Sequence, residues 1–146
     1  MVKKLGMEMM YFPISYVPER DLAEFDKALA ATAQANCDAL VVFPDAGMMA
    51  VSGRIAQFAA GARLPSVSGW TPFAQSGFLL TYGPDLRALY RSLARYVDRI
   101  LRGARPADLP VELPARFEFA INLKTARALG LEVPPTLLAR ADEVIE

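Results

Sequence analysis

The sequence contains no histidine and a single cysteine, Cys37. Without histidine, the chain cannot form a histidine-based catalytic triad, a histidine metal site or a histidine pH switch. One cysteine cannot close an internal disulfide and is too few for a cysteine zinc site. Because Cys37 lies just before an apolar run, we expect a buried, unreactive thiol.

Surplus charge and long apolar runs are also missing. The 146 residues include 16 Lys and Arg against 16 Asp and Glu, so the formal net charge is zero. Proteins dedicated to nucleic acid need surplus cations for phosphate contacts, so nucleic acid is not an expected partner. No stretch approaches the ~18 apolar residues of a membrane span. The first residues resemble a signal peptide only superficially, because Glu8 interrupts the apolar segment and no cleavage site follows.

Apolar runs typical of strands alternate with helical patterns along the chain. Strands are expected at residues 7–14, 40–43, 65–68 and 78–83, and helices at 18–36, 51–62 and 84–102. In the longest of these helices an arginine recurs at every fourth position, which indicates a solvated face or, alternatively, a surface for anions or nucleic acid. This alternation predicts a single α/β domain over residues 1–146, with a mainly parallel twisted sheet and helices on both faces.

The stretch from Gly103 to Gly130 breaks the simple alternation. Its three prolines exclude a regular helix, and residues 111–113 and 117–121 alternate apolar and polar side chains as strands do. Asn122 is a good N-cap for a helix that ends at Gly130. A last helix is expected at residues 136–145, after a pair of prolines.

Chemically suggestive residues lie at the carboxyl ends of three of the expected strands: Asp45 with Ala46, Gly69 with Trp70, and Tyr82. In open α/β sheets, ligands bind beyond the carboxyl ends of the strands. A carboxylate, two large aromatic rings and free backbone amides suit a small molecule with an ammonium or aromatic part. The competing interpretation is local structure, with the aspartate as a helix cap and the rings as edge packing.

No catalytic constellation or cofactor fingerprint is present. The serines lack a histidine base and a G-x-S-x-G elbow, and the glycines form neither a phosphate loop nor a dinucleotide fingerprint. The carboxylates are scattered without paired spacing. We therefore expect no enzymatic activity, no cofactor and no metal.

Several motifs in the second half carry a family resemblance. They are Tyr82-Gly83, residues 96–103, residues 106–112, residues 122–126 and residues 141–145. With them, the chain resembles the C-terminal half of ABC transporter substrate-binding proteins of the TrpX-like type, closely over residues 77–146 and more loosely over 5–70. One departure lies at Gly77-Phe78, where the family pattern has a double glycine.

The resemblance implies extracytoplasmic proteins whose two α/β lobes close on a small solute, often aromatic or amino-acid-like, and deliver it to a membrane permease. This chain would correspond to the second lobe of a class I periplasmic-binding-protein-like fold, truncated before that lobe, with a crossover helix at about 84–102. Asp45, Ala46, Gly69, Trp70 and Tyr82 would contact the solute, and an ABC permease would be the partner. A periplasmic or extracytoplasmic location is expected, or the cytoplasm if the signal peptide is genuinely missing.

The helix at 84–102 carries an apolar face that needs a partner, formed by Leu86, Leu89, Leu93, Val97 and Ile100. In the resembling family that face belongs against the other lobe, so a homodimer is expected to cover it here. The alternative function is a self-associating interaction or sensor module that keeps the fold but has left transport.

Overall fold

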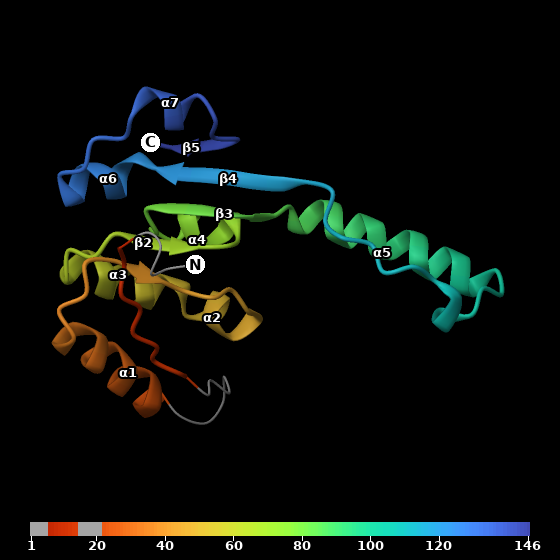
Figure 1. Ribbon diagram of the computed structural model, residues 1–146, viewed down its shortest axis with the longest axis horizontal. Helices are drawn as coiled ribbons and strands as arrows, with labels where there is room; N and C mark the ends of the chain where they lie inside the picture. Colours follow the sequence, from red (N-terminus) through yellow and green to blue (C-terminus); the bar gives the residue numbers. More distant parts are fainter. Residues whose placement is uncertain (1–5, 15–21) are drawn as a thin grey trace. The chain divides into compact units, whose positions relative to one another are not determined.

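The computed structural model describes residues 6–14 and 22–146 (Figure 1). The chain divides into two compact units, Met1–Asp38 and Ala39–Glu146. No helix in the described ranges is long and apolar enough to cross a membrane.

The first unit contains the helix α1, Leu22–Gln34, at the place where a helix was expected. Its expected start, at residues 18–21, lies outside the described residues. The strand expected at residues 7–14 is wrong, because none of these residues belongs to a strand. Tyr11 is 72% exposed, and Met7, Met9 and Met10 are also exposed. An apolar run without the burial and hydrogen-bond ladder of a sheet does not form a central strand. Cys37 is half-buried rather than buried.

The second unit is built on a sheet of five strands in the order β1-β2-β3-β4-β5. The strands are β1 Leu40–Val41, β2 Ser66–Ser68, β3 Leu80–Pro84, β4 Phe117–Asn122 and β5 Glu143–Ile145. All neighbouring pairs are parallel except β3 and β4, which run antiparallel. The predicted mainly parallel α/β sheet is confirmed, with residues 117–121 added at its side.

Helices connect the parallel strands and supply the core. Between β1 and β2 lie α2, Ala46–Ala50, and α3, Ser52–Gly61, and between β2 and β3 lies α4, Thr71–Gln75. Phe73 of α4 and the following Phe78 are fully buried, with their rings edge to face at 5.1 Å. The Asn122 side chain donates to the Ala74 carbonyl at 2.9 Å, which fixes α4 against the end of β4.

Alternation along the strands gives the sheet two different faces. Thr81 and its partner Ala120 are fully buried and point to the α4 face. Tyr82 and its partner Phe119 point to the opposite face, where the helix α7, Pro135–Leu138, contributes Leu137. Tyr82 is nevertheless 63% exposed. The α7 face therefore leaves aromatic surface accessible to a ligand.

Between β3 and β4 the chain makes a long excursion, residues 85–116, which we call the arm. It consists of α5, Leu86–Leu101, the short 3₁₀ helix η2, Pro106–Asp108, and a returning segment. Figure 1 shows α5 extending away from the sheet with the returning segment beside it. The Tyr96 hydroxyl donates to the Pro110 carbonyl at 2.6 Å, and Arg95 pairs with Glu112 at 3.3 Å.

The sequence patterns in two proline-rich segments mislead. Residues 111–113 form no strand, because they run along α5, where Val111 is 95% exposed. The single last helix expected at 136–145 is also wrong. Only the four residues of α7 are helical, and β5 follows, parallel to β4. Asp142 turns the chain toward β4, since its N–H donates to the Phe119 carbonyl at 2.8 Å.

Candidate functional site

The loops after β1 and β2 meet the last residues of β3 at the carboxyl ends of these strands. A Cβ atom on Gly69 would lie 2.9 Å from Pro44, and one on Gly83 would overlap the carbonyl of Gly69. Backbones can approach this closely only where side chains are absent. The segments that carry Asp45, Trp70 and Tyr82 are therefore neighbours, as expected for the switch region of an α/β sheet.

Asp45 is exposed and acts as the N-cap of α2. Its Oδ1 atom accepts a hydrogen bond from the Met48 N–H at 2.7 Å. Ala46, the first residue of the helix, is also exposed. Asp45 is therefore a helix cap, as the competing interpretation of the sequence expected. Its second carboxylate oxygen is still available to a ligand, since Asp45 forms no ion pair with a described residue.

The rings of Trp70 and Tyr82 belong to different clusters. Trp70 contacts Phe73 of α4, with ring centroids 6.5 Å apart. Tyr82 stacks on Phe117 at 5.7 Å and 23° and meets Phe119 edge to face at 6.3 Å. Trp70 and Tyr82 are close along the backbone, but no ring contact joins them within the described part of the chain.

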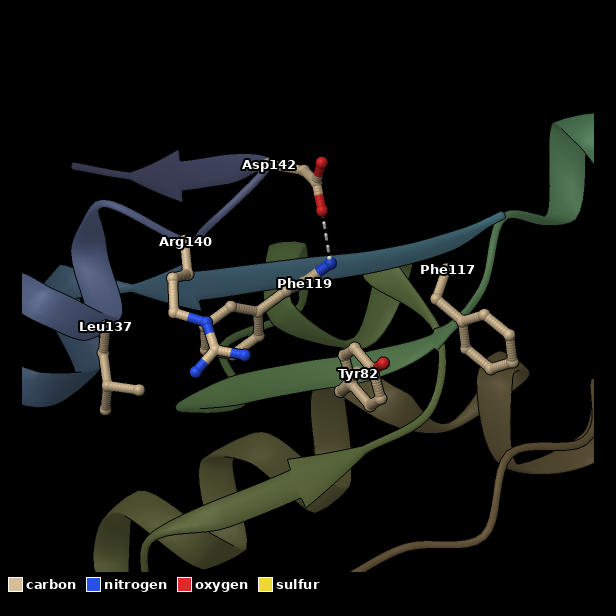
Figure 2. A pocket seen from close by; sticks show the side chains of 6 residues that line it. All are labelled: Tyr82, Phe117, Phe119, Leu137, Arg140 and Asp142. Atoms are coloured by element: carbon tan, nitrogen blue, oxygen red, sulfur yellow. Dashed lines mark hydrogen bonds between the residues drawn. The ribbon is translucent and has the colours of Figure 1, made fainter. Parts of the chain in front are cut away.

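The second aromatic cluster lines a cavity of about 380 Å³ on the α7 face, which Figure 2 shows from close by. Its lining residues are Tyr82, Phe117, Phe119, Leu137, Arg140 and Asp142. Of these, only Tyr82 was expected from the sequence as a site residue. The antiparallel register of β3 with β4 places Phe119 opposite Tyr82 and Phe117 opposite Pro84. The alternating phenylalanines were visible in the sequence, but their partner strand was not.

Asp85 is a second residue whose role the sequence did not separate from the other helix-start carboxylates. It is only 6% exposed. Its Oδ1 accepts from the Ala88 N–H at 2.9 Å and caps α5, while Oδ2 lies 3.5 Å from the Arg116 guanidinium. Its N–H donates to the Arg116 carbonyl. Asp85 therefore joins the two ends of the arm and is not free to bind a solute.

The described residues offer no cluster of acidic or cysteine side chains that could hold a metal ion. What remains is an α/β sheet with open loops at its strand ends and an aromatic cavity nearby. These features define a small-molecule-binding domain of the α/β class.

The family model described as ABC transporter substrate binding protein matches residues 2–145, so the chain belongs to this family. The family is a substrate-binding one, which supports a solute-binding role. No curated protein matches the chain.

Solved structures share the fold of this chain. A conserved domain protein from Vibrio cholerae is 26% identical, with a TM-score of 0.77 over 84% of this chain and 41% of its own. An ABC domain from Streptococcus pneumoniae in complex with L-Trp is 24% identical, with a TM-score of 0.77 over 84% and 41%. A ligand-free, open substrate binding protein from Clostridium difficile, 20% identical, has a TM-score of 0.57 over 84% and 40%. The chain thus spans about two fifths of the length of each structure.

Proposed function

We propose that this chain is the solute-binding lobe of an ABC transporter substrate-binding protein and binds a small amino-acid-like or aromatic solute. The observation that carries the proposal is the meeting of the loops after β1 and β2 with the end of β3, within a chain whose family is defined by substrate binding. The L-Trp complex of the Streptococcus pneumoniae domain, which shares the fold, supports an aromatic amino acid as the first solute to test.

In this proposal, five residues at the strand ends contact the solute. The exposed Asp45 carboxylate holds its ammonium group, and the backbone at Ala46 and Gly69 borders it. Either Trp70 or Tyr82 stacks on the apolar part of the solute. The two rings are alternatives because Trp70 contacts Phe73 and Tyr82 contacts Phe117. Because one lobe buries a ligand on one side only, affinity should be weak.

The biological role that follows is import. A solute-loaded protein of this family would deliver its solute to an ABC permease, which makes the permease the proposed macromolecular partner. Delivery to an importer requires an extracytoplasmic location, and we propose this location on the strength of the family.

Calorimetric titration with tryptophan, tyrosine and phenylalanine tests the proposal. We expect saturable binding that weakens about tenfold in Asp45→Ala, because a charge-assisted hydrogen bond to the ammonium is lost. Asp38→Ala is the matched control, since it removes an exposed carboxylate that precedes β1, at the amino end of that strand rather than at a carboxyl end. Equal affinities of the wild type and Asp45→Ala would remove Asp45 from the site, and the absence of any saturable binding would contradict the solute class.

We also propose that the chain is a homodimer in which α5 packs against the partner. None of the sixteen residues of α5 is buried, and Tyr90, Leu93 and Val97 are each more than half exposed. Such apolar surface favours association, and a formal net charge of zero offers no repulsion between copies. Analytical ultracentrifugation across micromolar concentrations measures the mass, and a persistent monomer would contradict the dimer.

A further inference from the structure

The cavity on the α7 face is lined mainly by residues that do not belong to the proposed strand-end site. Three aromatic rings and Leu137 form its apolar walls, and Arg140 supplies a cation (Figure 2). We propose that this cavity is a distinct binding site for small aromatic carboxylates, with Arg140 as the group that recognises the anion. It shares only Tyr82 with the strand-end residues and does not involve Asp45.

The rings form a corner that suits one more aromatic ring. Tyr82 and Phe119 meet at 76°, and Phe117 extends the wall as it stacks on Tyr82 at 23°. A ring placed in this corner can stack on one wall and meet the other edge to face, which are the two favoured aromatic geometries. A cavity of about 380 Å³ lies within the range of small-ligand pockets and suits a single-ring or bicyclic molecule.

Arg140 is the charged group available for an anion. It forms no ion pair or side-chain hydrogen bond with any described residue, and it lines the same cavity as Tyr82 and Phe119, with its guanidinium drawn beside the Phe119 ring in Figure 2. A guanidinium next to apolar walls binds a carboxylate through two parallel hydrogen bonds. The cavity therefore favours an anionic aromatic molecule over a neutral one.

The one acidic lining residue, Asp142, is engaged elsewhere. Its Oδ2 atom accepts from the Phe119 N–H at 2.9 Å, and no ion pair joins it to Arg140. In Figure 2 its carboxylate is turned to the Phe119 amide rather than to the Arg140 guanidinium. Asp142 thus orders the cavity wall and leaves the arginine charge without an internal partner.

The backbone around Arg140 is held on both sides. Its N–H donates to the Leu137 carbonyl at 3.0 Å, at the end of α7, and the Asp142 N–H donates to the Phe119 carbonyl at 2.8 Å. Arg140 is therefore fixed between a helical turn and the edge of β4. A cation whose backbone is already ordered loses less conformational entropy when it binds a ligand.

The test compares an acid with its neutral isostere. The wild type is titrated with 3-phenylpropionate and with 3-phenylpropionamide by calorimetry, together with Arg140→Gln, Arg140→Lys and the control Arg127→Gln. Arg127 is an exposed arginine on α6, Leu123–Leu129, outside the cavity. Both probes lack an ammonium group, so a negative result in the Asp45 titrations does not decide this test.

We expect the acid to bind at least about tenfold more tightly than the amide, as loss of a charge-assisted pair implies. Arg140→Gln should reduce acid binding to the level of the amide, Arg140→Lys should retain part of it, and Arg127→Gln should leave it unchanged. Amide NMR of the wild type should shift at Tyr82 and Phe119. Equal affinities for acid and amide, an unaffected Arg140→Gln, or shifts confined to other parts of the chain would each overturn the proposal.

Discussion

At the scale of single residues, a close approach of two backbones in the sheet depends on a missing side chain. Gly83 lies against the backbone of Gly69, and a methyl group at Gly83 would overlap the Gly69 carbonyl. This contact brings the ends of β2 and β3 together and so shapes the proposed strand-end site. A backbone cannot move aside as readily as a flexible side chain can.

We therefore expect Gly83→Ala to lower the free energy of unfolding by about 1–3 kcal/mol, measured by denaturant titration. Gly53→Ala is the control, because a Cβ there meets open space within α3. That change should be neutral or stabilising by up to about 1 kcal/mol. A Gly83→Ala protein as stable as the wild type would show that the two backbones are not held in contact.

Residue types predicted the location of the proposed strand-end site better than its chemistry. Asp45 and Trp70 come shortly after parallel strands and Tyr82 lies near the end of another, and a sheet rule was enough to group them. The sequence could not reveal that Trp70 faces Phe73 while Tyr82 faces Phe117, because that depends on pairing between distant strands. Arg140 carried no signal at all, since only the pairing of β5 with β4 brings it to the cavity.

At the scale of elements, the arm explains why β4 runs against β3. The chain leaves the sheet at Pro84 and returns at Phe117, and these two residues are paired in the register. The Asp85 N–H donates to the Arg116 carbonyl at 3.0 Å, directly beside this pair. The arm is thus a long hairpin connection, and a hairpin returns its second strand antiparallel.

Asp85 should stabilise the start of α5 and its connection to the returning segment of the arm. Replacing it with alanine removes the cap on the Ala88 N–H and the ion pair with Arg116, so we expect a loss of about 0.5–2 kcal/mol. Circular dichroism should show reduced helicity, and denaturant unfolding should report the energy. Asp85→Asn retains a capping oxygen and should lose clearly less. If both variants unfolded like the wild type, capping by this carboxylate would be irrelevant to α5.

Local patterns located the longer helices and the parallel strands, although Val41 of β1 is 63% exposed rather than buried. They failed where a strand depends on a neighbour. Residues 7–14 and 111–113 have apolar or alternating patterns, yet neither forms a strand. Glu143–Ile145 is a strand within a segment that was expected to be helical. β5 forms because it pairs with β4, and this pairing is a property of the assembled sheet that a local pattern does not contain.

At the scale of the whole molecule, folding of the chain and the proposed association of two copies depend on different residues. The core uses Phe73, Phe78 and Ile121, which are all nearly or fully buried. The apolar residues of α5 contribute little to it, since none is buried within the protomer. A substitution on the exposed face of α5 can therefore weaken association without unfolding the protein.

Val97→Asp is the substitution that separates association from folding. Val97 is 54% exposed, so an aspartate there should change the stability of the protomer by no more than about 0.5 kcal/mol. In the proposed dimer the same carboxylate would be buried against apolar side chains, which is strongly unfavourable. We expect analytical ultracentrifugation to show a monomer at concentrations where the wild type is dimeric.

Arg91→Asp provides the control, because it places the same side chain on the arginine-bearing side of α5, where the helix is solvated. This variant should remain dimeric with an unchanged circular dichroism spectrum. If Val97→Asp and Arg91→Asp dissociated equally, net charge rather than the apolar face would govern association. If Val97→Asp stayed dimeric, the interface would lie elsewhere, and α5 would require a different partner for its apolar residues.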